Sequence, residues 1–246
     1  IGLSLVGSEM CIRDRVGTFA WNTARHLELY FAVPCTNRVL HTLNIRLFPE
    51  QLVYIINHAE DEVIFVDRSL LALLLPLMDQ LQTVRHLIVM DDGPGDVPDS
   101  SQILDYEDLL SDANGVEFSV RDERQAASMC YTSGTTGNPK GVVYSHRSTY
   151  LHTLSTMSAD VLGIRESDVI LPVVPMFHVN SWGLQHAAVA VGATLVNPGP
   201  NLQAEPIARL LESEKVTITA GVPTIWMGVL PELAGRHLPD LRAIAC

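Results

Sequence analysis

The residues best suited to chemistry lie in one central stretch, YTSGTTGNPKGVVYSH, from Tyr131 to His146. It shows neither helix nor strand periodicity before its last six residues, GVVYSH. Glycines let a backbone turn so that N–H groups converge on an anion, and hydroxyls bind phosphate oxygens or a hard cation such as Mg²⁺. The pattern predicts a loop that holds a di- or triphosphate. The hydroxyl residues are Thr132, Ser133, Thr135 and Thr136, and the glycines between them are Gly134 and Gly137.

Lys140 adds a mobile positive charge that can reach a polyphosphate, and Pro139 stiffens the end of the loop. The common P-loop, G-x-x-x-x-G-K-[ST] before a helix, does not fit, because two residues separate Gly137 from Lys140 and a glycine follows the lysine. A plain hairpin turn would not need four hydroxyls, two internal glycines and a lysine together. The sequence therefore favours a phosphate-binding loop of another class.

Composition narrows the class of protein. The 246-residue chain has a formal net charge of −12 and no basic cluster, so nucleic acid is a poor partner. No apolar run is long enough to span a bilayer. The four cysteines lack C-x-x-C spacing, which indicates a reduced, cytoplasmic protein without structural zinc.

Helical segments alternate with short apolar segments along the chain, which predicts an α/β fold with a mostly parallel sheet. The loop lies between two expected strands. Helices are expected at 21–32, 49–61, 69–81, 103–112, 148–158, from about 180, at 204–214 and at 224–233. Strands are expected at 62–67, 86–92, 127–133, 141–146, 168–175, 193–199, 216–221 and 241–246.

A second candidate site is PMFHVNSW, from Pro175 to Trp182. A helix starting near His178 would place His178 and Trp182 one turn apart on one face. The alternative is a core histidine beside a packing tryptophan. His186 lies another turn on, but two turns are too far for one metal ion and no carboxylate lies between, so no metal site is predicted.

YTSGTTGNPKG resembles the signature loop of the adenylate-forming superfamily, which contains acyl-CoA synthetases, luciferases and adenylation domains. The resemblance runs from about Val16 to Cys246. Four segments of the chain are similar to the medium- and long-chain fatty acyl-CoA ligase branch, namely AWNTARHLELYFAV, LHTLNIRLFPEQLVYIINHAED, VVPMFHVNSWGL and TAGVPTIW. The resemblance implies part of the large N-terminal domain of that fold, with alternating helices and mostly parallel strands, incomplete at both ends.

The resemblance also implies a reaction in two steps. A carboxylate attacks the α-phosphate of ATP to give acyl-adenylate and pyrophosphate, and coenzyme A then displaces AMP. Thr132 would ligate Mg²⁺, while Ser133 to Gly137 and Lys140 would wrap the β- and γ-phosphates. His178 would lie near the carboxylate, and Trp182 would gate the acyl tunnel. The implied acyl-site residues are His178, Val179, Trp182, Gly221, Val222 and Pro223, although the small residues of AGVPT equally suit ordinary strand-to-helix packing.

Both ends and one internal segment depart from the family pattern. Residues 1–15 are predicted to be non-native read-through, with a genuine N-terminal strand and turn as the alternative. Residues 16–246 are predicted to be a partial N-terminal domain without the C-terminal domain, and LRAIAC (Leu241–Cys246) is expected to be a buried strand. Arg38, in PCTNRV, stands where the family has small residues. The chain alone is therefore expected to be inactive.

Two other functions stay open. One is an adenylating enzyme for an aromatic or amino acid. The other is a non-catalytic nucleotide-binding module, which would bind ATP weakly and independently of Thr132 and Lys140. The sequence leaves the acyl chain length, and whether the chain forms a homo-oligomer, undecided.

Overall fold

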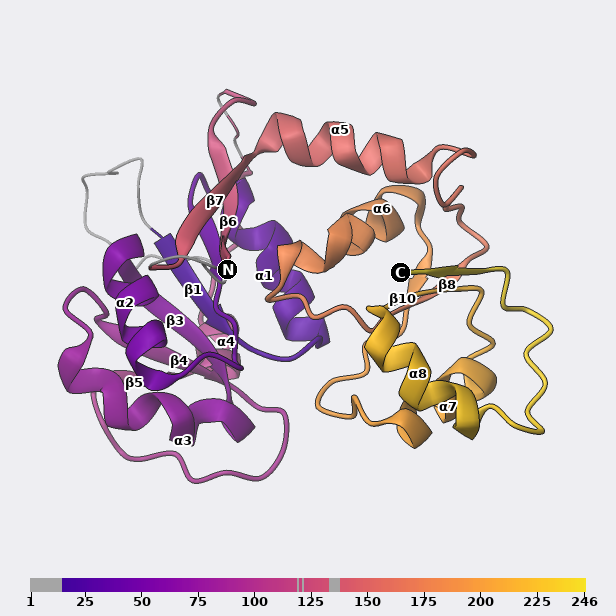
Figure 1. Cartoon of the computed structure of the whole chain (residues 1–246). Coiled ribbons are helices and arrows are strands. Elements are labelled where there is room, and N and C mark those ends of the chain that lie inside the picture. Colours follow the sequence, from indigo (N-terminus) through magenta and orange to yellow (C-terminus); the bar gives the residue numbers. More distant parts are fainter. Residues whose placement is uncertain (1–14, 119, 121, 133–137) are drawn as a thin grey trace. The chain divides into compact units, whose positions relative to one another are not determined.

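The computed structural model describes residues 15–118, 120, 122–132 and 138–246 (Figure 1). The chain divides into two compact units. The first comprises Ile1–Ala20 and Arg25–Arg147, and the second comprises Trp21–Ala24 and Ser148–Cys246. Each unit contains its own sheet, so each is described separately below.

The first unit is built on a sheet with the strand order β5-β4-β3-β1-β2-β6-β7. All neighbours are parallel except β6 and β7, which form an antiparallel pair. The central strands are rich in Val and Ile and are buried, as expected for a parallel sheet covered on both faces. The strands are β1 (Arg15–Phe19), β2 (Val39–Thr42), β3 (Asp61–Asp67), β4 (His86–Met90), β5 (Ile103–Asp105), β6 (Ala126–Thr132) and β7 (Lys140–Ser145).

The sequence of helix α2 explains where this helix begins, where it ends and which face it buries. Pro49 occupies its first turn, where the missing N–H costs nothing, and Glu60 ends it in the left-handed conformation. Leu52, Ile55 and Ile56 share one face and are buried. Helix α2 comprises Pro49–Ala59. The other helices of this unit are α1 (Ala24–Cys35), α3 (Leu71–Leu74), which lies between the 3₁₀ turns Arg68–Leu70 and Leu75–Gln80, and α4 (Tyr106–Ser111).

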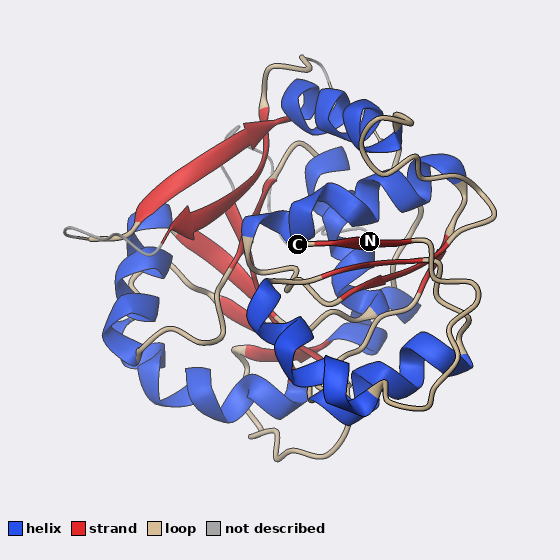
Figure 2. Ribbon diagram, turned by 45° about the vertical axis from the view of Figure 1, so that its right-hand side comes forward, coloured by secondary structure: helices blue, strands red, loops and turns tan. Residues whose placement is uncertain are grey.

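The second unit has a fully parallel sheet with the order β11-β10-β8-β9. Successive side chains of β8 pack into hydrophobic clusters on opposite faces of the sheet, because side chains alternate along a strand. Ile170 packs with α6, whereas Leu171 packs with α7 and α8, so helices cover both faces (Figure 2). The elements are α5 (His146–Met157), β8 (Val169–Pro172), α6 (Leu184–Val191), β9 (Thr194–Leu195), α7 (Ala204–Ser213), β10 (Ile218–Ala220), α8 (Pro223–Glu232) and β11 (Ala243–Ala245).

A charged cluster fastens the amino ends of three of these strands. Arg242 donates to both carboxylate oxygens of Asp168 at 2.9 and 2.6 Å, and Thr217 donates to the same carboxylate at 2.8 Å. Burial alone would raise the pKa of Asp168, but the hydrogen bonds from Arg242, the Arg165 N–H and Thr217 outweigh it and lower the pKa to about 2. The cluster thereby ties the starts of β8, β10 and β11 together.

The predicted α/β fold with a mostly parallel sheet is confirmed. Strands β1 and β2 were not expected, because Gly17 and His41 interrupt their short apolar patterns. The helix expected at 103–112 begins only at Tyr106, since Ile103–Asp105 pair with β4. The expected buried strand at the end of the chain is instead an edge strand, and Ile244 is 48% exposed.

Arg38 lies in the turn between α1 and β2, directly after Asn37, which has a positive φ of 60°. Its departure from the family pattern therefore falls in a connection and not in a strand. No helix within the described ranges is both long and apolar enough to cross a membrane.

Candidate functional site

The described part of the central motif contains the end of β6 and all of β7, which form a hairpin in the first unit (Figure 1). The last pair of the ladder joins Thr132 to Lys140, and the pair before it joins Tyr131 to Gly141. The Thr132 hydroxyl donates a long hydrogen bond of 3.5 Å to the Lys140 carbonyl, and both residues are exposed. The structure therefore brings two of the predicted phosphate-binding residues together. The predictions for Ser133, Gly134, Thr135, Thr136 and Gly137 lie outside the described residues.

The predicted acyl segment follows β8 in the second unit, and its backbone is not the expected helix. Val179, Asn180, Ser181 and Trp182 all have positive φ, at 48°, 47°, 48° and 54°, and Gly183 follows at 70°. Regular helix begins only at Leu184. The expectation that His178 and Trp182 stack one turn apart on a helix starting near His178 is therefore wrong.

Four successive L-residues in the left-handed region carry a backbone cost of roughly 1–2 kcal/mol each, and a β-branched residue such as Val179 is an outlier there. Such a turn persists only where its surroundings fix it. Ser181 is fully buried and donates to the Val174 carbonyl at 2.8 Å. The ring of His152 fills the space beside Gly183, where an added Cβ would lie 2.6 Å from its Nδ1.

Asn22 fixes the segment that leads into this turn. Its side-chain amide donates to the carbonyls of Pro172 and Val174 at 2.9 and 3.0 Å, and its oxygen accepts from the Met176 N–H at 2.7 Å. Asn22 is 4% exposed and comes from a part of the sequence about 150 residues earlier. Sequence reasoning missed it, because a single Asn beside Trp21 carries no local signal of this contact.

The second predicted acyl segment, Gly221 to Pro223, follows β10. The N–H groups of Val173 and Val174 both donate to the Ala220 carbonyl, at 2.9 and 3.0 Å. The two segments therefore leave adjacent parallel strands at the same edge of the sheet, the carboxyl edge where open α/β sheets bind ligands. Pro223 begins α8.

The aromatic residues of these segments differ in exposure. His178 is exposed at the start of the left-handed turn, whereas Trp182 is partly buried against the cluster formed with α6. His186 lies within α6, and burial together with His152 lowers its pKa to about 4. His186 is therefore neutral at pH 7. Among the residues that the structure describes, no three His, Cys, Asp or Glu side chains gather as metal ligands.

Comparison with known proteins places the chain in a family. The profile of the AMP-binding enzymes matches residues 7–246. The chain is 50% identical over 236 residues to the 3-methylmercaptopropionyl-CoA ligase of Ruegeria lacuscaerulensis, covering 94% of this chain and 43% of that protein. It is 48% identical over 228 residues to the medium-chain-fatty-acid–CoA ligase of Ectopseudomonas oleovorans, covering 91% of this chain and 41% of that protein.

The fold agrees with this assignment. A crystal structure of the anthranilate CoA ligase AuaEII in complex with anthranoyl-AMP matches with a TM-score of 0.80 and 23% identity, over 94% of this chain and 44% of that one. The chain belongs to the AMP-binding enzyme family, so the predicted membership of the adenylate-forming superfamily is confirmed. It spans about two-fifths of the length of the curated relatives that it matches.

Proposed function

We propose that a protein of the relatives' full length, containing this chain, activates a carboxylic acid with ATP and transfers the acyl group to coenzyme A. In the first step, a carboxylate oxygen bonds to the α-phosphorus and pyrophosphate leaves. In the second step, the thiolate of coenzyme A attacks the acyl carbonyl and AMP leaves, giving a thioester. Positioning and charge neutralisation dominate the first step.

The observation that carries this proposal is the Thr132–Lys140 pair at the end of the β6–β7 hairpin. An antiparallel ladder holds the two backbones, and both side chains are exposed at the point where the Gly-rich segment is attached. In our proposal Lys140 neutralises the β- and γ-phosphates and stabilises the departing pyrophosphate. Ser133 to Gly137 would complete the phosphate contacts with backbone N–H groups and hydroxyls.

Magnesium suits the chemistry of this pair. The Thr132 hydroxyl is exposed and its hydrogen bond to the Lys140 carbonyl is long, at 3.5 Å, so it can turn toward a cation. Hard oxygen ligands of this kind are those that Mg²⁺ prefers, together with phosphate oxygens of a nucleotide. Bound Mg²⁺ would neutralise phosphate charge. We therefore propose Thr132 as a Mg²⁺ ligand alongside ATP.

The acyl group would bind at the carboxyl edge of the second sheet. We propose that His178 orients the reacting carboxylate and that Trp182 gates the acyl pocket. Val179, Gly221, Val222 and Pro223 would line that pocket. Support comes from the junction at Ala220, which joins the two segments at one sheet edge. An exposed His178 also directly precedes the left-handed turn, which contains the half-buried Trp182.

A fatty acid is the proposed substrate class, with medium or long chains from the sequence resemblance. The relatives' names also include a short thioether acid, 3-methylmercaptopropionate, so the chain length is the part that experiment must decide. The alternatives are an aromatic or amino acid activator, and a non-catalytic nucleotide-binding module. From the acidic charge and the cysteine spacing we propose a cytoplasmic location.

The test is acid-dependent pyrophosphate release by the full-length protein, with octanoate, palmitate, 3-methylmercaptopropionate, benzoate and an amino acid compared at equal concentration. We expect release with aliphatic acids and its loss in Lys140→Ala. Preference for benzoate or the amino acid would replace the fatty acid by the first alternative. No release with any acid, together with ATP binding that Lys140→Ala leaves unchanged, would favour the binding module.

A further inference from the structure

We propose that Tyr131 is a positioning residue for the Thr132–Lys140 pair, and that His58 and the buried His41–Asp61 pair hold its ring in place. This inference rests on the proposed function, because it concerns how the hairpin presents its phosphate-binding side chains. All four residues lie in the first unit.

Tyr131 occupies the last ladder position before the Thr132–Lys140 pair. Its partner across the hairpin is Gly141. A Cβ added to Gly141 would lie 3.3 Å from Cζ of Tyr131, so the ring lies against the glycine backbone of the opposite strand. Whatever fixes the Tyr131 ring therefore also fixes the backbone next to Thr132 and Lys140.

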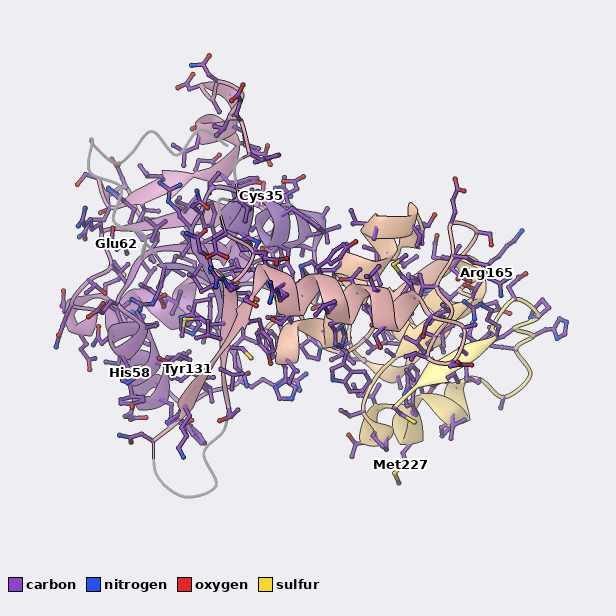
Figure 3. All side chains as sticks on the ribbon, turned by 90° about the horizontal axis from the view of Figure 1, so that it is seen from above. Cys35, His58, Glu62, Tyr131, Arg165 and Met227 are labelled. Atoms are coloured by element: carbon purple, nitrogen blue, oxygen red, sulfur yellow. The ribbon has the colours of Figure 1, made fainter. Side chains whose placement is uncertain are left out.

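The outer contact of the ring is a hydrogen bond to helix α2. The hydroxyl of Tyr131 lies 2.7 Å from Nδ1 of His58, although 73 residues separate the two in sequence (Figure 3). His58 itself stacks on Tyr54, with ring centroids 5.3 Å apart. Burial, and then the charge of Asp61, raise the pKa of Tyr131 to about 12, so the phenol stays neutral and keeps its proton for hydrogen bonding.

The inner contact of the ring is His41 on β2, whose ring centroid lies 5.1 Å from that of Tyr131. Nδ1 of His41 lies 2.7 Å from Oδ2 of Asp61, and both side chains are fully buried. Gly17 lies beside this pair on the intervening strand β1. A Cβ there would lie 3.5 Å from Oδ2 of Asp61, an ordinary contact distance, and 3.0 Å from Cγ1 of Ile64.

A buried His–Asp pair contributes little net free energy to the stability of a sheet. Desolvation offsets much of the attraction, and well-packed apolar residues of similar volume are often as stable. The pair does, however, fix the orientation of the His41 ring, because its Nδ1 is bound to the carboxylate. Tyr131 is then held between a fixed imidazole and a hydrogen bond to α2, which favours positioning over simple packing.

The test is calorimetric titration of MgATP into a protein of the relatives' full length that contains this chain. Tyr131→Phe removes only the hydroxyl and should weaken binding about threefold to tenfold, the typical effect of one hydrogen bond. In the Lys140→Ala background the same change should have little further effect, because contacting residues that act through one group are not additive. His58→Ala should match Tyr131→Phe, and His58→Gln, which can still bond to the phenol, should restore most of the affinity.

The matched control is Tyr144→Phe. Tyr144 lies on β7 of the same hairpin, and its hydroxyl contacts Sγ of Cys130 at 4.0 Å and not α2. We expect wild-type affinity for this variant. Thermal unfolding of each variant separates loss of fold from loss of position, since a positioning role lowers affinity at an unchanged unfolding midpoint.

The outcomes separate the two proposals. If the wild-type full-length protein binds no MgATP, or if Lys140→Ala leaves binding unchanged, the proposed function of the hairpin fails and this inference fails with it. If Lys140→Ala weakens binding but Tyr131→Phe does not, only the positioning role is overturned. A Tyr131→Phe loss that persists in full without Lys140 would also overturn it.

Discussion

The two regions proposed to bind substrate hold their backbones in opposite ways. In the first unit, the Thr132–Lys140 pair is the last rung of a regular antiparallel ladder, with Tyr131 and Gly141 packed against each other one rung earlier. In the second unit, the turn beginning at Val179 consists of residues with positive φ, and no ladder supports it. Side-chain hydrogen bonds from Asn22 and Ser181 hold it and the segment before it.

This difference shows where each region is vulnerable. A ladder distributes its support over many backbone hydrogen bonds, so changing one exposed side chain at its end costs little stability. A left-handed turn depends on a few buried side chains that outweigh its strain. Removing one of these should therefore destabilise the second unit far more than Thr132→Ala destabilises the first.

The largest effect is expected for Asn22→Ala. It removes three side-chain hydrogen bonds from a buried site, so the free energy of unfolding should fall by about 3 kcal/mol. Urea denaturation measures this. Asn201→Ala, at an exposed position of the same unit, is the control and should change stability by less than about 0.5 kcal/mol. Equal effects would show that Asn22 does not anchor the segment.

A smaller, pH-dependent effect is expected at the opposite end of β8. The folded-state pKa of Asp168 is about 2, below its ordinary value of 3.8. Its contribution is therefore complete above about pH 4 and is lost as the pH falls toward 2. The difference corresponds to about 2 kcal/mol.

Urea denaturation of wild type and Asp168→Asn from pH 6 to pH 2 tests this contribution. The stability difference between the two should shrink toward the acid end. A constant difference across that range would mean that the carboxylate charge contributes nothing to the link with Arg242.

The smallest effect has the opposite sign. Val179→Gly should stabilise the protein by roughly 0.5 kcal/mol, because glycine accepts a positive φ without the cost paid by valine, and this outweighs its extra freedom in the unfolded chain. Val179 is 41% exposed, so little packing is lost. Val189→Gly, at a similarly exposed helical position, should instead destabilise by about 0.5 kcal/mol. Destabilisation by both changes would contradict strain at Val179.

The same contrast explains what could be predicted from the sequence. The helix that begins at Pro49 and the strands on either side of the Gly-rich segment follow from local patterns and were predicted. The antiparallel pairing of these two strands, which joins Thr132 to Lys140, was not predicted. By contrast, β2 was missed because His41 breaks its apolar run, and only the sheet around it and Asp61 make that residue suitable.

The turn after His178 could not be predicted for a related reason. HVNSWG has no glycine before its last position, so its residue types favour a right-handed helix start over left-handed residues. The choice is made by Asn22 and by Ser181, through contacts that depend on the tertiary fold. Such contacts cannot be predicted from the local sequence. The His58–Tyr131 hydrogen bond was beyond reach for the same reason.

The central claim is that the end of the β6–β7 hairpin binds a nucleoside triphosphate. The most direct test compares the MgATP affinity of Lys140→Ala with that of Lys215→Ala. Lys215 lies in the second unit with a φ of 52°, a conformation in which Lys and Ala are equally strained, so its change is a matched removal of one charge. We expect Lys140→Ala to weaken binding at least tenfold, about 1.4 kcal/mol or more, and Lys215→Ala to leave it unchanged. Equal affinities for the two variants would contradict the account.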